Sequence, residues 1–129
     1  MKETILYIND DIQEDDYNFI ESVRNSEYNF KSCIITGYVQ KWDGKHNICP
    51  VETEGLLDAI YRCTDKMDGI IIKFVEDHLE LECSHHDGTN VFQIYLLSEA
   101  GYDAYEDDCD VDFSNEKYHD KMLLEKILV

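Results

Sequence analysis

The sequence predicts an α+β fold in a single domain, residues 1–129, with a mainly antiparallel sheet and about three helices packed on one of its faces. The length of 129 residues suits one hydrophobic core. Residues 69–97 consist of three apolar runs separated by short polar turns, which is typical of a β-meander in the C-terminal half. Three other segments have apolar residues at helical spacing or begin at capping residues.

The meander is predicted from its turns and from the alternation of its side chains. Asp87-Gly88 is a strong hairpin signal, because both loop residues must tolerate positive φ. A tight turn near Glu76 and Asp77 places Ile72 and Phe74 beside Leu79 and Leu81. With Asp87 and Gly88 as the loop, the predicted pairs are His86 with Thr89, Cys83 with Phe92, Leu81 with Ile94, Leu79 with Leu96, Glu82 with Gln93 and Glu80 with Tyr95.

The remaining elements follow in chain order. The pattern indicates strands at 4–8 and from Phe30 to Lys41 or Trp42, a turn at Asp43-Gly44, and helices at 12–24 and at 53–65 with Thr53 as a cap. Residues 98–113 form a long loop or a short acidic edge strand near 108–113. Ser114 or Asn115 then caps a closing helix, whose predicted buried stripe is Tyr118, Met122, Leu123, Ile127 and Leu128.

The charge of the chain departs furthest from that of an ordinary domain. The sequence has 11 Lys and Arg residues against 29 Asp and Glu residues, for a formal net charge of −18. Solubility is satisfied by a net charge of about 2 to 8 in a small domain. Residues 74–116 contain thirteen acids and no Lys or Arg. So much like charge repels itself, and we therefore expect it to serve recognition.

The acids predict imitation of a nucleic acid. Spaced carboxylates resemble a row of phosphates, so a protein built to bind phosphates accepts them through its own Lys and Arg. The competing interpretation is a solvated acidic surface without a partner. The predicted partner-binding residues are Asp103, Glu106, Asp107, Asp108, Asp110, Asp112, Asp10, Asp11, Glu14, Asp15, Asp16, Glu80, Glu82 and Trp42.

Metal binding and catalysis are disfavoured by the sequence. The stretch from Asp103 to Asp112 lacks the glycine and the terminal Glu of an EF-hand loop. His85 and His86 are adjacent on a predicted strand, so they should point to opposite faces and brace the turn, with a partner-contacting tip as the alternative. No nucleophile elbow or phosphate loop is present. We therefore predict no catalytic residue, no metal and no cofactor.

Trp42 has two interpretations. Trp42 lies beside a turn, where an exposed ring suits a protein contact, but the favoured prediction is that it closes one end of the core.

The five cysteines form no CxxC pair, as expected in a reducing cytosol. With neither a signal-peptide core nor about 18 consecutive apolar residues, we expect a soluble, cytoplasmic protein without membrane contact.

Two turn motifs, GYVQKWDGKHN and SHHDGTNVFQIYL, resemble those of small bacterial proteins carried by prophages and conjugative elements. The likeness covers about Cys33 to Leu97 and carries no catalytic role. It implies a mobile-element context, in which acidic inhibitors of restriction enzymes and CRISPR nucleases occur. The chain is similar to those inhibitors in size and charge.

These observations predict a non-enzymatic acidic inhibitor that blocks the groove of a defence nuclease or another nucleic-acid-binding protein and does not itself bind nucleic acid. The alternative is a regulatory protein-interaction module, homodimeric through a sheet edge or the Trp42 turn, whose charge serves solubility only. A metal-dependent enzyme or sensor is the least favoured interpretation.

Overall fold

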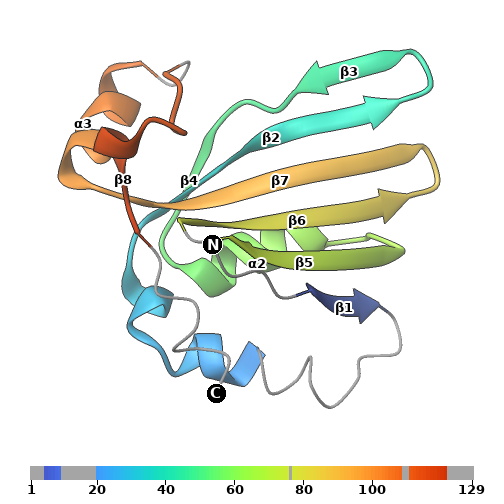
Figure 1. Ribbon diagram of the computed structural model, residues 1–129, viewed down its shortest axis with the longest axis horizontal. Helices are drawn as coiled ribbons and strands as arrows, with labels where there is room; N and C mark the ends of the chain where they lie inside the picture. Colours follow the sequence, from blue (N-terminus) through green and yellow to red (C-terminus); the bar gives the residue numbers. More distant parts are fainter. Residues whose placement is uncertain (1–4, 10–19, 76, 109–110, 122–129) are drawn as a thin grey trace.

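The computed structural model describes residues 5–9, 20–75, 77–108 and 111–121. Within these ranges the chain has the predicted α+β architecture, a twisted antiparallel sheet with helices packed against it (Figure 1). The predicted helix stripe beyond residue 121 and most of the predicted helix at 12–24 lie outside the described residues; of the latter, residues 20–24 are helical.

The described residues form an eight-stranded sheet in which neighbouring strands are antiparallel. The main path of the sheet is β1-β5-β6-β7-β2-β3, with β4 paired to β2 and β8 paired to β7. The strands are β1 (Ile5–Asn9), β2 (Cys33–Lys41), β3 (Gly44–Asn47), β4 (Val51–Thr53), β5 (Gly69–Val75), β6 (His78–His85), β7 (Gly88–Leu97) and β8 (His119–Asp120).

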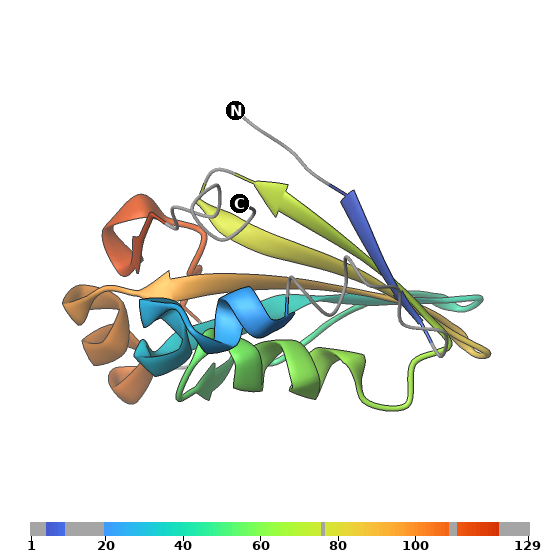
Figure 2. The same ribbon diagram turned by 90° about the horizontal axis from the view of Figure 1, so that it is seen from below.

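Two α-helices lie wholly within the described residues, α2 (Leu56–Thr64) and α3 (Glu99–Asp107). Two short 3₁₀ turns are also present, η1 (Glu27–Phe30) and η2 (Glu116–Tyr118). Figure 2 shows α2 and the helical residues 20–24 against one face of the sheet. Among the described residues, no helix has both the length and the apolar character needed to cross a membrane.

The meander has the predicted strands, but its second hairpin has a different register. In the first hairpin Ile72 pairs with Leu81, as predicted. In the second, Leu81 pairs with Phe92 rather than with Ile94, because His86 and Asp87 form the loop and Gly88 already belongs to β7. A shift of two residues leaves every side chain on its predicted face.

A close approach of two strands explains why Gly88 lies in β7 and not in the loop. Its φ of +154° disfavours other residues, and a Cβ built there would lie 2.2 Å from the carbonyl oxygen of Gln40 on β2. In the β2–β3 hairpin the glycine also begins the second strand, although no atom would lie within 4 Å of a Cβ there. Its loop is Trp42-Asp43, and Gly44, with φ of +128°, begins β3.

Alternation along the strands produces two apolar clusters on opposite faces of the sheet. The larger cluster packs the inner face against α2 and η1, and includes Cys33, Ile35, Leu56, Ile60, Ile72, Leu79, Leu81, Ile94 and Leu96. The smaller cluster lies on the other face and consists of Ile34, Tyr95 and Phe113, with Leu97, Tyr105, Val111 and Tyr118 packed against it. It attaches residues 111–118 to the sheet (Figure 2).

Two boundaries differ from their predictions for local reasons. Thr53 does not cap α2; it ends β4, is buried, and donates its hydroxyl to the Gly55 carbonyl at 3.2 Å. The closing helix predicted from residue 114 or 115 begins as the short turn η2, in which the Asn115 side chain accepts a hydrogen bond from Lys117, and the chain then enters β8.

Buried thiols behave as core residues, as predicted. Cys33, Cys63 and Cys83 are buried and free, whereas Cys49 is exposed. Burial raises the pKa of Cys33 and of Cys83 to about 12. These thiols therefore stay protonated near neutral pH and act as small apolar side chains.

Comparison of two glycines tests the contact between β2 and β7. A Cβ at Gly37 would stand 1.9 Å from the Val91 carbonyl oxygen, whereas a Cβ at Gly44 meets nothing within 4 Å. Both residues have positive φ, so we expect Gly44→Ala to lower the free energy of unfolding by about 1 to 3 kcal/mol through backbone strain. Gly37→Ala should lower it further. Equal losses in urea denaturation would contradict the close approach.

Candidate functional site

Helix α3 occupies residues for which a loop or an edge strand was predicted. The Ser98 side chain accepts a hydrogen bond from the Gly101 amide at 3.0 Å, and Glu99 lies in the first turn, where the helix dipole favours a carboxylate. Gly101 also allows close contact with Tyr118, since a Cβ would stand 1.9 Å from the Tyr118 carbonyl oxygen. Capping and packing thus form a helix from a segment interrupted by glycine and aspartate.

The helix brings predicted contact residues together on an exposed surface. Asp103, Glu106, Asp107 and Asp108 are all exposed. Glu99 precedes Asp103 by four residues, so the two carboxylates lie on the same side of α3. Figure 1 shows α3 beside η2 at one end of the sheet.

Tyr102 shows that a carboxylate from another element joins this surface. The charge of Glu106 and then that of Glu52 on β4 raise the pKa of Tyr102, with a hydrogen bond to Glu106 and the charge of Asp103 adding to the effect. The sequence does not reveal Glu52 as part of this surface, because Glu52 is fifty residues from Tyr102 along the chain and lies outside the acid-rich segments.

Residues 111–120 add three exposed carboxylates, Asp112, Glu116 and Asp120. The hydroxyl and the amide of Ser114 donate to Asp112, and these bonds lower the pKa of Asp112. The segment is held beside α3 by a bond from the Ser98 amide to the Tyr118 carbonyl. We call the following set the acidic end: Glu52, Glu99, Asp103, Glu106, Asp107, Asp108, Asp112, Glu116 and Asp120.

The other predicted contact residues are placed elsewhere. Glu82 on β6 forms an ion pair with Lys73 on β5, with 3.9 Å between Oε2 and Nζ. Glu80 lies near Tyr95, whose pKa is raised to about 12 by burial and then by the charges of Asp77, Asp112 and Glu80. The predicted contacts Asp10, Asp11, Glu14, Asp15, Asp16 and Asp110 lie outside the described residues.

Trp42 is exposed, so the prediction that it closes an end of the core is wrong. Its side chain is 96% exposed in the two-residue loop between β2 and β3. Lys41 pairs with both Gly44 and Gly88, which places this loop beside the His86-Asp87 loop. The two hairpin tips share a hollow of about 720 Å³, lined by Lys41, Trp42, Asp43, Ser84, His85, His86, Asp87, Gly88 and Thr89.

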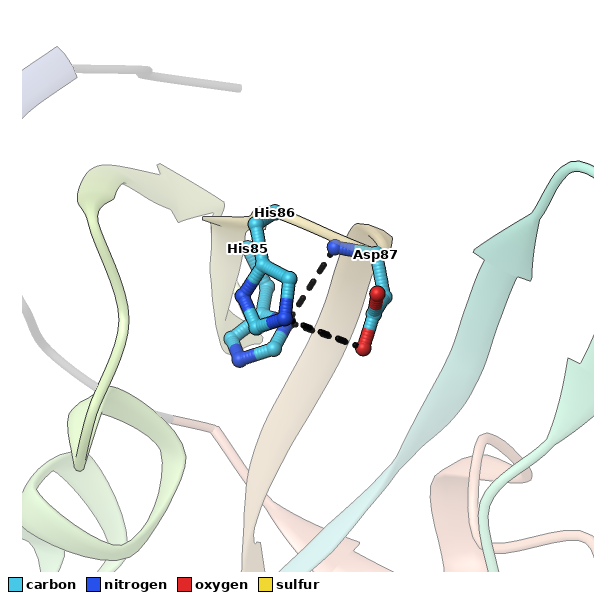
Figure 3. Close-up of side chains that lie close together, drawn as sticks. All are labelled: His85, His86 and Asp87. Carbon is cyan, nitrogen blue, oxygen red and sulfur yellow. Dashed lines mark hydrogen bonds and ion pairs between the residues drawn. The ribbon is translucent and has the colours of Figure 1, made fainter.

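The argument that His85 and His86 point to opposite faces is also wrong. His86 belongs to the loop and not to β6, so strand alternation does not apply to it. The two imidazole rings lie 4.0 Å apart, centroid to centroid, and Asp87 closes the group (Figure 3).

A second group of histidines surrounds Tyr95. His78 stacks on the Tyr95 ring at 4.8 Å, and His119 contacts the same ring at 4.7 Å. Nδ1 of His78 lies 2.8 Å from Oδ1 of Asp77, within hydrogen-bond distance. Partial burial opposes the ionisation of Asp77. The hydrogen bond and charge of His78, together with the charge of His119, nevertheless hold the pKa of Asp77 below its ordinary value. Residues 78 and 119 are too far apart in the chain for any local pattern to reveal this group.

Comparisons with protein-family models, with curated proteins and with solved structures find no match for this chain. The resemblance to proteins of mobile elements therefore stays a prediction. The function has to be inferred from the arrangement of charges and side chains.

Titration of Tyr102 tests the assembly of the acidic end. Negative charge nearby disfavours the phenolate, so removing that charge with Glu106→Gln should lower the pKa of Tyr102, and Glu52→Gln should lower it as well. Ring resonances followed by NMR between about pH 8 and 12 report the shift near the ordinary pKa of about 10. Asp65→Asn, at the far end of α2, serves as the control. No change in Glu52→Gln would show that β4 does not adjoin α3.

Proposed function

We propose that this protein is a non-enzymatic acidic inhibitor that imitates nucleic acid and blocks the DNA- or RNA-binding groove of a host-defence nuclease or a similar protein. The observation that carries the proposal is the acidic end, where carboxylates from β4, α3 and residues 111–120 adjoin one another. The described residues from 98 to 121 include two bases, Lys117 and Lys121, against eight acids of that set.

The linear density of charge on α3 supports phosphate mimicry. Four of its nine residues are acids, Glu99, Asp103, Glu106 and Asp107. At a rise of about 1.5 Å per residue, this gives roughly one carboxylate per 3.4 Å of helix. One strand of duplex DNA carries one phosphate per about 3.4 Å of axis. A groove lined with Lys and Arg would therefore meet a similar density of negative charge.

The position of these acids is unfavourable for the helix itself. Asp107 is the last residue of α3, where the macrodipole is negative, and the last turn contains no basic residue. A carboxylate at this position interacts unfavourably with the helix dipole. Attraction to a cationic partner would offset that cost.

Charge is also unevenly distributed along the sheet. The acidic end lies at one end of β2 and β7, and the hairpin tips lie at the other (Figure 1), where Lys41 and Lys45 balance Asp43 and Asp87 beside three histidines. Such a dipole would orient the acidic end toward a positively charged groove during encounter.

Neutralising two α3 carboxylates tests the proposal. Restriction endonucleases and guide-loaded CRISPR nucleases form the panel, and binding to a responding partner should weaken steeply between about 50 and 200 mM salt and compete with DNA. Asp103→Asn combined with Asp107→Asn should weaken binding about tenfold or more and flatten the salt dependence, because fewer counterions are exchanged.

The matched control is Asp65→Asn combined with Asp68→Asn, which removes the same charge from exposed positions at the opposite end of the sheet. This variant should bind as the unmodified protein does. Equal weakening by both variants would indicate a general effect of net charge, and a flat salt response would contradict phosphate mimicry.

The exposure of Trp42 favours a second candidate, a protein-interaction module in which the charge serves solubility. An almost fully exposed Trp is an unusual surface residue and a frequent binding anchor. If this function is correct, Trp42→Ala should raise the Kd for the partner by about 30-fold or more, in line with a loss of at least 2 kcal/mol at a hot spot. The Asp103 and Asp107 double variant would then bind normally.

A further inference from the structure

Three potential metal ligands converge at the tip of the β6–β7 hairpin. The Nε2 atom of His86 lies 3.4 Å from Oδ2 of Asp87, and Nδ1 of His85 lies 3.8 Å from the same oxygen. One ligand atom from each of the three residues falls within 4.8 Å of the others. Ligand atoms held about 2.0 to 2.2 Å from one ion lie roughly 3 to 3.5 Å apart. Small side-chain rotations would therefore complete the site.

The backbone of the hairpin causes this convergence. His85 ends β6 and pairs with Gly88, so the chain reverses within His86 and Asp87 and turns their side chains toward His85 (Figure 3). The Asp87 amide donates a hydrogen bond to Nδ1 of His85 at 3.3 Å. A nitrogen that accepts a hydrogen bond carries no proton, and a metal ion bound at this nitrogen would take the same lone pair and replace the hydrogen bond.

We propose that His85, His86 and Asp87 bind a first-row transition-metal dication of the Zn²⁺ type. Imidazole nitrogen suits Zn²⁺, Ni²⁺ and Cu²⁺, and two imidazoles with one carboxylate leave at least one coordination position open. The side chains of His86 and Asp87 are 73% and 66% exposed, so an ion enters from solvent without rearrangement of the core.

The three candidate ligands line the hollow between the two hairpin tips. Asp43 lines this hollow together with the three ligands, whereas Lys41 lines it with a positive charge that weakens cation binding. Water or a donor group of a bound partner would occupy the free coordination position. The inference is independent of the proposed function, because the ligands and the acidic end lie at opposite ends of the sheet.

Zn²⁺ titration of the untagged full chain tests the site. We expect one Zn²⁺ per chain in isothermal titration calorimetry, and shifts of the His85 and His86 imidazole nitrogens in NMR spectra. His86→Ala and His85→Ala should each raise the Kd for Zn²⁺ by about tenfold or more, because even the loss of a residue that only hydrogen-bonds to a metal ligand lowers metal affinity about 10- to 100-fold. His86 is an exposed loop residue, so its variant should remain folded, which circular dichroism checks.

Two controls separate this site from general binding to carboxylates. His46→Ala removes another exposed histidine, paired with Asp43 at 3.3 Å on the neighbouring tip, and should retain the wild-type affinity. The Asp103→Asn and Asp107→Asn variant should retain it as well. Unchanged affinity in His86→Ala, or a loss in either control that equals its loss, would overturn the assignment.

Discussion

The pairing of β2 with β7 is the constraint on which the rest of the structure depends. It runs from Cys33 opposite Leu96 to Lys41 opposite Gly88 and lies in the middle of the sheet. Two glycines, Gly37 and Gly88, occupy positions where the facing backbone leaves no room for a Cβ. At one end of this ladder the strands support the acidic end, and at the other they place two hairpin tips side by side.

Burial on both faces at one end of the ladder explains how the acidic end is held. Ile34 and Tyr95 point away from the main core and form the base of the smaller cluster, on which Phe113 packs. This cluster positions residues 111–118, and the Ser98 and Gly101 contacts with η2 then position α3. Apolar packing of a few aromatic rings thus has to offset the mutual repulsion of the carboxylates around it.

The two ends of the sheet offer different chemistry on one rigid element. Carboxylates of the acidic end suit a cationic groove, whereas imidazoles and a tryptophan at the hairpin tips suit a metal ion or an apolar pocket. The β2–β7 ladder, from Cys33 opposite Leu96 to Lys41 opposite Gly88, separates the two ends. A bound partner could therefore be held at the acidic end while the tips remain accessible.

The sequence by itself determined the fold class, the strands of the meander, the face on which each of their side chains lies, and the excess of acids. These features depend on composition and on local periodicity, and a short segment of sequence is enough to reveal that periodicity. Tertiary structure alone decided the register of β6 with β7, the helical state of residues 99–107, the exposure of Trp42, and the proximity of Glu52 and Glu106 to Tyr102. A shift of two residues does not alter an alternating pattern, so the local pattern does not distinguish the registers; the register selected in the fold places Gly88 in β7, where the Gln40 carbonyl oxygen leaves no room for a Cβ. That selection also moves His86 into the loop beside His85, where strand alternation no longer applies.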